Sequence, residues 1–246
     1  MTLTEQFRAA RRVSTPLIAI RTPDPAATIA GLMASLNGGG GAVLRWNIVS
    51  GLQGANEAGR DALAALNVEP SLTTNPVDAL GLCAGLPARA LVCCENFHRI
   101  IGEQGVSQAV WNLRDRYKQD QRTLVMLAPE ITMPAELAQD VLMLDEALPD
   151  NAALAAIVAE TYTAAGLEAP DAETSIKAVD ALCGLAAFPA EQATAMSLTR
   201  DGLDMGALWE RKRQMIEATP GLSVWRGGET FDGIGGCANA KTFMSR

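Results

Sequence analysis

Short apolar runs alternate with helical stretches along the first 150 residues of the chain. Runs such as 16–21 and 90–94 are apolar almost throughout, which is typical of strands buried on both faces. Between them lie amphipathic segments bounded by Gly or Pro. This alternation predicts a mainly parallel sheet with helices on both faces. The predicted strands are 16–21, 42–49, 90–94, 122–128 and 141–144; the predicted helices are 4–12, 25–36, 76–86 and 106–119; residues 51–74 are predicted as loop with at most a short helix.

The pattern changes at Asp150, where apolar strands give way to four successive helical segments. Asp150, Asp171 and Asp204 stand where helix N-caps belong, as does Asp24 before Pro25 in the first part. We therefore expect an α/β domain over 1–148 and a compact helical domain over 149–218, followed by a linker over 219–246. The predicted helical segments of the second part are 150–166, 171–185, 189–200 and 204–218.

Composition excludes several classes of protein. The net charge is −8 and no long cluster of Lys and Arg occurs, which argues against a nucleic-acid footprint. Five cysteines without a C-x-x-C pair, together with a single histidine, argue against a structural zinc site. The uncharged apolar runs are too short for a membrane span, and no signal peptide is recognisable. We expect a cytoplasmic protein whose thiols stay reduced.

The end of the chain carries the most specific pattern. Residues 229–244 contain Phe231-Asp-x-Ile-Gly-Gly followed by x-x-Asn-x-Lys, which resembles the segment that precedes the ATPase core of AAA proteins. Further motifs resemble, in order, a bacterial and plastid AAA family whose first module is degenerate. These motifs are Pro16-Leu-Ile, Thr22-Pro23, Trp46, Phe97-His98, Leu113-Arg-Asp115, Pro134-Ala-Glu-Leu137, Leu148-Pro-Asp150 and Lys212-Arg-Gln-Met-Ile216.

The resemblance implies a degenerate AAA-like domain, related to P-loop NTPases, followed by a four-helix lid. The chain stops at Arg246, before the phosphate-binding loop that would follow in such a family. A second AAA module is therefore expected downstream as a partner, with ATP and Mg²⁺ bound there, and the full-length protein is expected to be a homo-oligomeric ATPase. Without that module, we expect residues 219–246 to be poorly ordered, with Trp225 and Phe231 as anchors.

Departures from a working ATPase indicate that the first module does not hydrolyse ATP. A phosphate-binding loop needs G-x-x-x-x-G-K-[ST], whose N–H groups and Lys hold the phosphates. The corresponding turn here contains Thr22, Pro23 and Asp24, with neither the Gly nor the Lys. The acidic pair that would follow the next ATPase strand is Glu95-Asn96, and an amide cannot act as a general base.

Two further ATPase elements are also missing: Pro129 occupies the sensor position, and residues 136–140 contain no arginine for a finger. We therefore expect no catalytic residues, no metal and no cofactor in this chain. The alternative function is a small-molecule site in the vestigial nucleotide cleft, or an enzyme of another class, although no motif supports either.

Three groups of residues have both a chemical and a structural interpretation. His98 could serve in acid–base chemistry, but no nucleophile accompanies it, so a structural role is favoured. Cys93-Cys94 could be a redox pair, but adjacent strand residues point to opposite faces, which favours buried thiols. Arg114-Asp-Arg116 with Lys118 could act on a neighbouring subunit, but a solvated, internally paired helix face is favoured.

Overall fold

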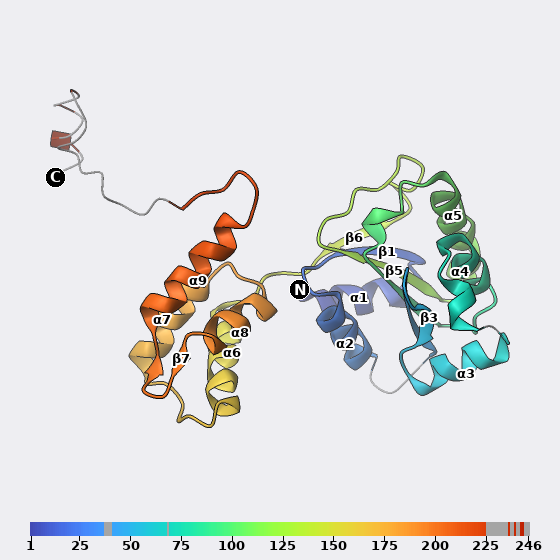
Figure 1. The fold of residues 1–246 in the computed structure, drawn as a ribbon. Coiled ribbons are helices and arrows are strands. Elements are labelled where there is room, and N and C mark those ends of the chain that lie inside the picture. The colour runs from blue at the N-terminus through green and yellow to red at the C-terminus, as the bar shows by residue number, and fades with distance from the viewer. Residues whose placement is uncertain (37–40, 68, 225–235, 237–238, 240–241, 244–246) are drawn as a thin grey trace. The chain divides into compact units, whose positions relative to one another are not determined.

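The computed structural model describes residues 1–36, 41–67, 69–224, 236, 239 and 242–243. It contains two compact units, Met1–Leu148 and Pro149–Arg246 (Figure 1). The first unit is an α/β structure, and the second consists mainly of helices. The fold is therefore of the predicted α/β class.

A six-stranded sheet forms the centre of the first unit, in the strand order β3-β2-β4-β5-β1-β6. All neighbouring strands are parallel except β2 and β3, which form an antiparallel pair at one edge. The five predicted strands are confirmed, and β3 is an addition. The strands are β1 (Leu17–Arg21), β2 (Val43–Asn47), β3 (Gly51–Gly54), β4 (Leu91–Glu95), β5 (Thr123–Ala128) and β6 (Leu142–Asp145).

Helices cover both faces of this sheet (Figure 1). One face packs against α1 (Leu3–Arg12) and α2 (Pro25–Ser35). The other packs against α3 (Glu57–Ala65), α4 (Pro76–Cys83) and α5 (Gln104–Gln119). The alternation of side chains along a strand divides the core accordingly: Cys93 contacts the first cluster and its neighbour Cys94 the second.

The segment 51–74 was predicted as loop with a possible short helix; the helix is present, but the segment also contains a strand and a 3₁₀ helix that were not predicted. After a turn at Gly51, whose φ is +65°, the chain forms β3, then α3, then the 3₁₀ helix η1 (Pro70–Thr73). Helix α3 begins where the side chain of Asn56 accepts the N–H of Gly59. Only a few apolar residues of this segment face the core, so its hydrophobic periodicity was too weak to reveal two regular elements.

The predicted helix starts of the first and second units are confirmed at the aspartates. Asp24 caps α2 by accepting the N–H of Ala27 at 3.0 Å, and Pro25 occupies the first turn. Asp150, Asp171 and Asp204 each accept the N–H of the residue three positions later. A short side-chain acceptor satisfies a donor that has no partner inside the helix, which explains this placement.

The second unit contains the four predicted helices and one feature that contradicts the prediction. Residues 198–203 form a small antiparallel hairpin, although 150–218 was predicted to be free of strands. The third helix ends at Ala195 rather than at residue 200, and Gly202, with a φ of +117°, shapes the return of the hairpin. The elements are α6 (Asn151–Ala164), α7 (Ala172–Leu182), α8 (Ala187–Ala195), β7 (Leu198–Thr199), β8 (Gly202–Leu203) and α9 (Met205–Glu217).

The helices of the second unit pack around a separate apolar core that includes Leu154, Leu182 and Leu208. Residues 219–224 of the predicted linker are described, but Trp225 and Phe231, its expected anchors, lie outside the described residues. None of the helices in the described ranges is long and apolar enough to cross a membrane.

Candidate functional site

The turn that connects β1 to α2 lies at the carboxyl edge of the parallel strands, where α/β proteins commonly bind ligands. Four of its five backbone N–H groups are already paired within the chain. The N–H of Thr22 donates to the carbonyl of Ala128 at 2.8 Å, and that of Asp24 donates to the Thr22 hydroxyl at 3.0 Å. Ala27 donates to the Asp24 carboxylate at 3.0 Å, and Thr28 donates to the Asp24 carbonyl at 3.0 Å.

The remaining positions of this turn add little donor capacity. Pro23 and Pro25 have no N–H. In the described part of the chain, the N–H of Ala26 is the one backbone N–H of residues 22–28 that has no hydrogen-bond partner. A phosphate group needs several converging N–H donors and a cation, and the turn supplies neither.

A buried polar cluster closes the turn from the side. The hydroxyl oxygens of Thr22 and Thr28 lie 2.7 Å apart, and both residues are almost fully buried. The Thr28 hydroxyl is also 2.7 Å from Oε2 of Glu146, a carboxylate that follows β6. A donor–acceptor distance of this length is typical of a charge-assisted hydrogen bond. Asp24 and Glu146 thus place two carboxylates at the position where a bound nucleotide would carry its negative charge.

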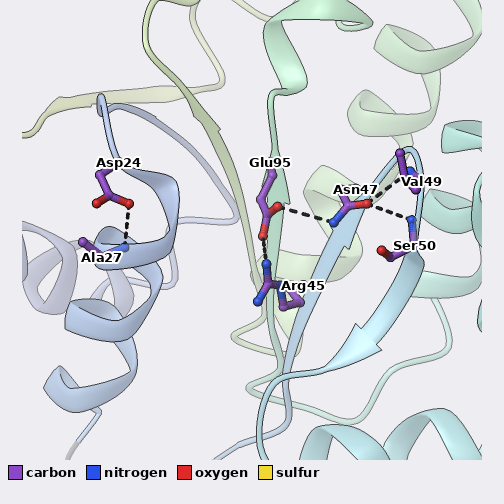
Figure 2. Close-up of polar contacts among 7 residues, drawn as sticks. All are labelled: Asp24, Ala27, Arg45, Asn47, Val49, Ser50 and Glu95. Carbon is purple, nitrogen blue, oxygen red and sulfur yellow. Dashed lines mark hydrogen bonds and ion pairs between the residues drawn. The ribbon is translucent and has the colours of Figure 1, made fainter. Parts of the chain in front are cut away.

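The acidic position after β4 is occupied by an ion pair. Oε1 of Glu95 accepts from Nη2 of Arg45 at 2.6 Å, and Oε2 lies 3.4 Å from Nδ2 of Asn47 (Figure 2). The orientation of the Asn47 amide is set by its Oδ1, which accepts the N–H groups of Val49 and Ser50. Both oxygens of Glu95 therefore contact side chains of the neighbouring strand β2.

Asn96, the second residue of this position, is exposed and has a φ of +53°. Asparagine tolerates the left-handed conformation better than most residues, because its short polar side chain can bond locally. The structure thus gives Asn96 a conformational role in the turn from β4 into η2 (Phe97–Arg99). The side-chain amide of Asn96 cannot accept a proton near neutral pH.

The arginines of α5 are paired within the same unit. Arg114 forms ion pairs with Asp115 at 3.0 Å and with Asp140 at 2.8 Å, and its guanidinium lies 4.9 Å from the centroid of the Trp111 ring. Asp140 belongs to the segment 136–140 that lacks an arginine finger. Arg116 and Lys118 are exposed on the same helix. For Arg114, the internally paired interpretation is confirmed.

Cys93 and Cys94 are buried thiols, as predicted, and Cys83 is buried as well. Burial raises the pKa of Cys83 and of Cys93 to about 12, and it raises the pKa of Cys94 well above the ordinary value. His98 is half-buried in η2, and its Nδ1 has no hydrogen-bond partner among the described residues. In the described ranges, no group of three or more His, Cys, Asp or Glu side chains is arranged to hold a metal ion.

Sequence reasoning located Thr22, Pro23, Asp24, Glu95 and Asn96 on this edge of the sheet but missed their partners. Thr28 lies six positions after Thr22, one helical turn into α2, where its burial was not apparent from the sequence. Arg45 and Glu146 come from elements 50 and 118 positions away from the residues they contact. Only the strand order and register bring them to the site.

The comparisons with known proteins concern both sequence and fold. The family described as "SpoVK-like AAA ATPase, N-terminal domain" matches residues 3–146. The uncharacterized AAA domain-containing protein ycf46 of Guillardia theta is 24% identical over 178 residues, which cover 69% of this chain and 35% of that protein. The chain thus spans about a third of the length of this curated relative.

Solved AAA-type structures share the fold at low sequence identity. The FIGL-1 AAA domain in complex with ADP has a TM-score of 0.54 at 10% identity, and the alignment covers 86% of this chain and 81% of that chain. Thermotoga maritima RuvB T158V also has a TM-score of 0.54, at 12% identity, with coverage of 87% and 67%. These values establish a common fold with the AAA-type ATPase domains.

Proposed function

The chain belongs to the family of SpoVK-like AAA ATPase N-terminal domains, and on this premise we propose that its own module is non-catalytic. In this proposal the module supports the assembly or the substrate engagement of an ATP-hydrolysing AAA module that follows it in a longer protein. ATP and Mg²⁺ bind to that second module. The helical unit acts as the lid of the first module, and the full-length protein works as a cytoplasmic homo-oligomer.

The observation that carries the proposal is the closed turn of residues 22–28. Apart from that of Ala26, its N–H donors are paired internally or absent, and the carboxylates of Asp24 and Glu146 would repel a phosphate group. In addition, Glu95 is held by Arg45 at 2.6 Å. Phosphate binding at this turn would require breaking these hydrogen bonds. Even then, the turn would lack the lysine that holds the phosphates in a phosphate-binding loop.

The position of the module in a longer protein is supported by the coverage of the relative. Only 35% of the ycf46 protein corresponds to this chain. The residues at 229–244 that resemble the start of an AAA core point to a catalytic module after residue 246. The paired polar groups of the turn give no support to the alternative, a small-molecule site in the vestigial cleft.

The first test is a titration of the 246-residue chain with Mg-ATP, followed by the backbone amide resonances of residues 22–28. We expect the resonances of Thr22, Asp24, Ala27 and Thr28 to stay in place at millimolar ATP, because their N–H groups already have partners. We also expect no turnover of ATP. Saturable shifts of the Asp24, Ala27 and Thr28 amides at micromolar ATP would contradict the proposal.

A second test uses the chain extended through the following domain. Glu95→Gln should leave the ATPase rate of the extended protein within about twofold of the wild type, since Glu95 polarises no water in this proposal. The same acid-to-amide change at the corresponding position of the downstream module should lower the ATPase rate by about a hundredfold or more. If Glu95→Gln lowered the ATPase rate of the extended protein as much as the change in the downstream module does, the first module would not be non-catalytic.

A further inference from the structure

A cavity of about 850 Å³ lies on the first unit, away from the turn of residues 22–28. It is lined by Met1 and one side of α1, by the end of α2, and by residues just before β4 and β5. These residues precede their strands, whereas Thr22 and Glu95 lie at the carboxyl ends. Since β1, β4 and β5 are parallel, the cavity lies at the amino ends of these strands, opposite the end at which Thr22 and Glu95 lie.

Four arginines line this cavity: Arg8, Arg11 and Arg12 from α1, and Arg89 from the loop before β4. We refer to it as the arginine cavity. The spacing of three and four positions puts the α1 arginines on one face of the helix. Among the described residues, none of the four takes part in a salt bridge, although the chain as a whole carries a net charge of −8.

The one acidic residue of the lining is already engaged. Glu5 accepts the N–H of Thr2 at 2.9 Å through Oε2, as part of the capping box that begins α1. A basic residue in the last turn of a helix is favoured by the helix dipole, which accounts for Arg11 and Arg12. It accounts neither for Arg8, one turn earlier, nor for Arg89 from another segment.

Arg11 is the centre of the cluster. Its Nη2 donates to the carbonyl of Arg89 at 2.8 Å, while its Nη1 is buried and has no hydrogen-bond partner in the described part of the chain. Burial, and then the charge of Arg89, lower the pKa of the Arg11 guanidinium. Arg8 donates through Nε to the carbonyl of Ser35 at 2.9 Å, which fixes its guanidinium at the rim.

We propose that the arginine cavity binds a small molecule that carries a phosphate or pyrophosphate group. Four guanidinium groups that line one cavity and form no salt bridge among the described residues favour an anion, and their planar donors match the geometry of phosphate oxygens. The volume lies in the range of small-molecule sites, which is about 300–1,000 Å³. This site is independent of the vestigial nucleotide turn and of the function proposed above.

The test is calorimetric titration of the 246-residue chain with pyrophosphate at about 150 mM salt, where long-range effects of charge are screened. The double variant Arg12→Gln with Arg89→Gln removes two exposed guanidinium groups that have no salt bridge in the described structure. We expect it to weaken binding at least about tenfold, because charge-assisted hydrogen bonds are lost. Arg99→Gln is the matched control: Arg99 is exposed just after the carboxyl end of β4, and its loss should leave the affinity unchanged.

A second measurement uses only the wild-type chain. Pyrophosphate should shift the Nε–Hε resonances of Arg8 and Arg11 and leave that of Arg99 in place. Absence of binding at millimolar pyrophosphate would overturn the proposal, as would equal binding by the double variant or an equal loss in Arg99→Gln. Malonate that binds as tightly as pyrophosphate would overturn the assignment to phosphate chemistry.

Discussion

Replacing Trp46 by alanine is expected to lower the free energy of unfolding by about 3–5 kcal/mol. The side chain is only 2% exposed, and its ring meets that of Phe97 edge-on, with centroids 6.2 Å apart. Its Nε1 donates to the carbonyl of Thr73 at 2.7 Å. Truncation would leave a cavity and would remove the hydrogen bond of the indole N–H. Since domains are stabilised by only about 5–15 kcal/mol, urea unfolding followed by circular dichroism should detect a large shift of the midpoint.

Two variants separate the contributions to this effect. Trp46→Phe retains most of the packing but loses the N–H, so we expect about 1–3 kcal/mol. Trp111→Ala removes the same kind of ring from an exposed position on α5, where it contacts Arg114, and should cost about 1 kcal/mol or less. A Trp111→Ala variant as unstable as Trp46→Ala would show that burial of Trp46 is not the cause.

The buried thiols should react with iodoacetamide at pH 8 about a thousandfold more slowly than an ordinary cysteine. The thiolate is the reactive form, and burial raises the pKa of Cys83 and Cys93 from 9.0 to about 12. Cys183 is exposed and serves as the internal reference. Mass spectrometry of the labelled peptides resolves the sites. Labelling of Cys83 or Cys93 in the folded chain at the rate of Cys183 would contradict the prediction.

The same pKa shift predicts a loss of stability in alkali. Between pH 9 and 12 the unfolded chain releases protons from these thiols, while the folded chain retains them. Stability is therefore fully present below pH 9 and falls as pH rises towards 12, by about 1.4 kcal/mol per pH unit for each thiol. The variant Cys93→Ala should show a slope that is shallower by this amount. A slope identical to that of the wild type would contradict the assignment.

The regular elements with strong apolar periodicity were predictable from the sequence. Strands such as β4 and β5 are apolar throughout because helices cover both of their faces. Helix starts were equally visible, since an aspartate before an apolar stretch satisfies free N–H groups at Asp150 and Asp171. Local chemistry determines these features, so a local pattern reveals them.

Elements that depend on distant contacts were not predictable. Among the described residues, strand β3 pairs with β2 alone, and the hairpin of residues 198–203 is held partly by the Tyr162 hydroxyl, which accepts the N–H of Leu203 at 3.0 Å. At the candidate site, the missing Gly and Lys were apparent from the sequence. The contacts of Thr28 with Glu146 and of Arg45 with Glu95 become visible only in three dimensions.

The place of β1 between β5 and β6 has a consequence for biosynthesis. Arg21 at the end of β1 and its partner Asp145 are 124 positions apart. At translation rates of about 5–20 residues per second, β1 must wait roughly 6–25 seconds for its neighbours to leave the ribosome. During that time Leu17, Ile18 and Ile20, which are fully buried in the finished fold, are exposed on the nascent chain. We therefore expect this segment to be a binding site for ribosome-associated chaperones.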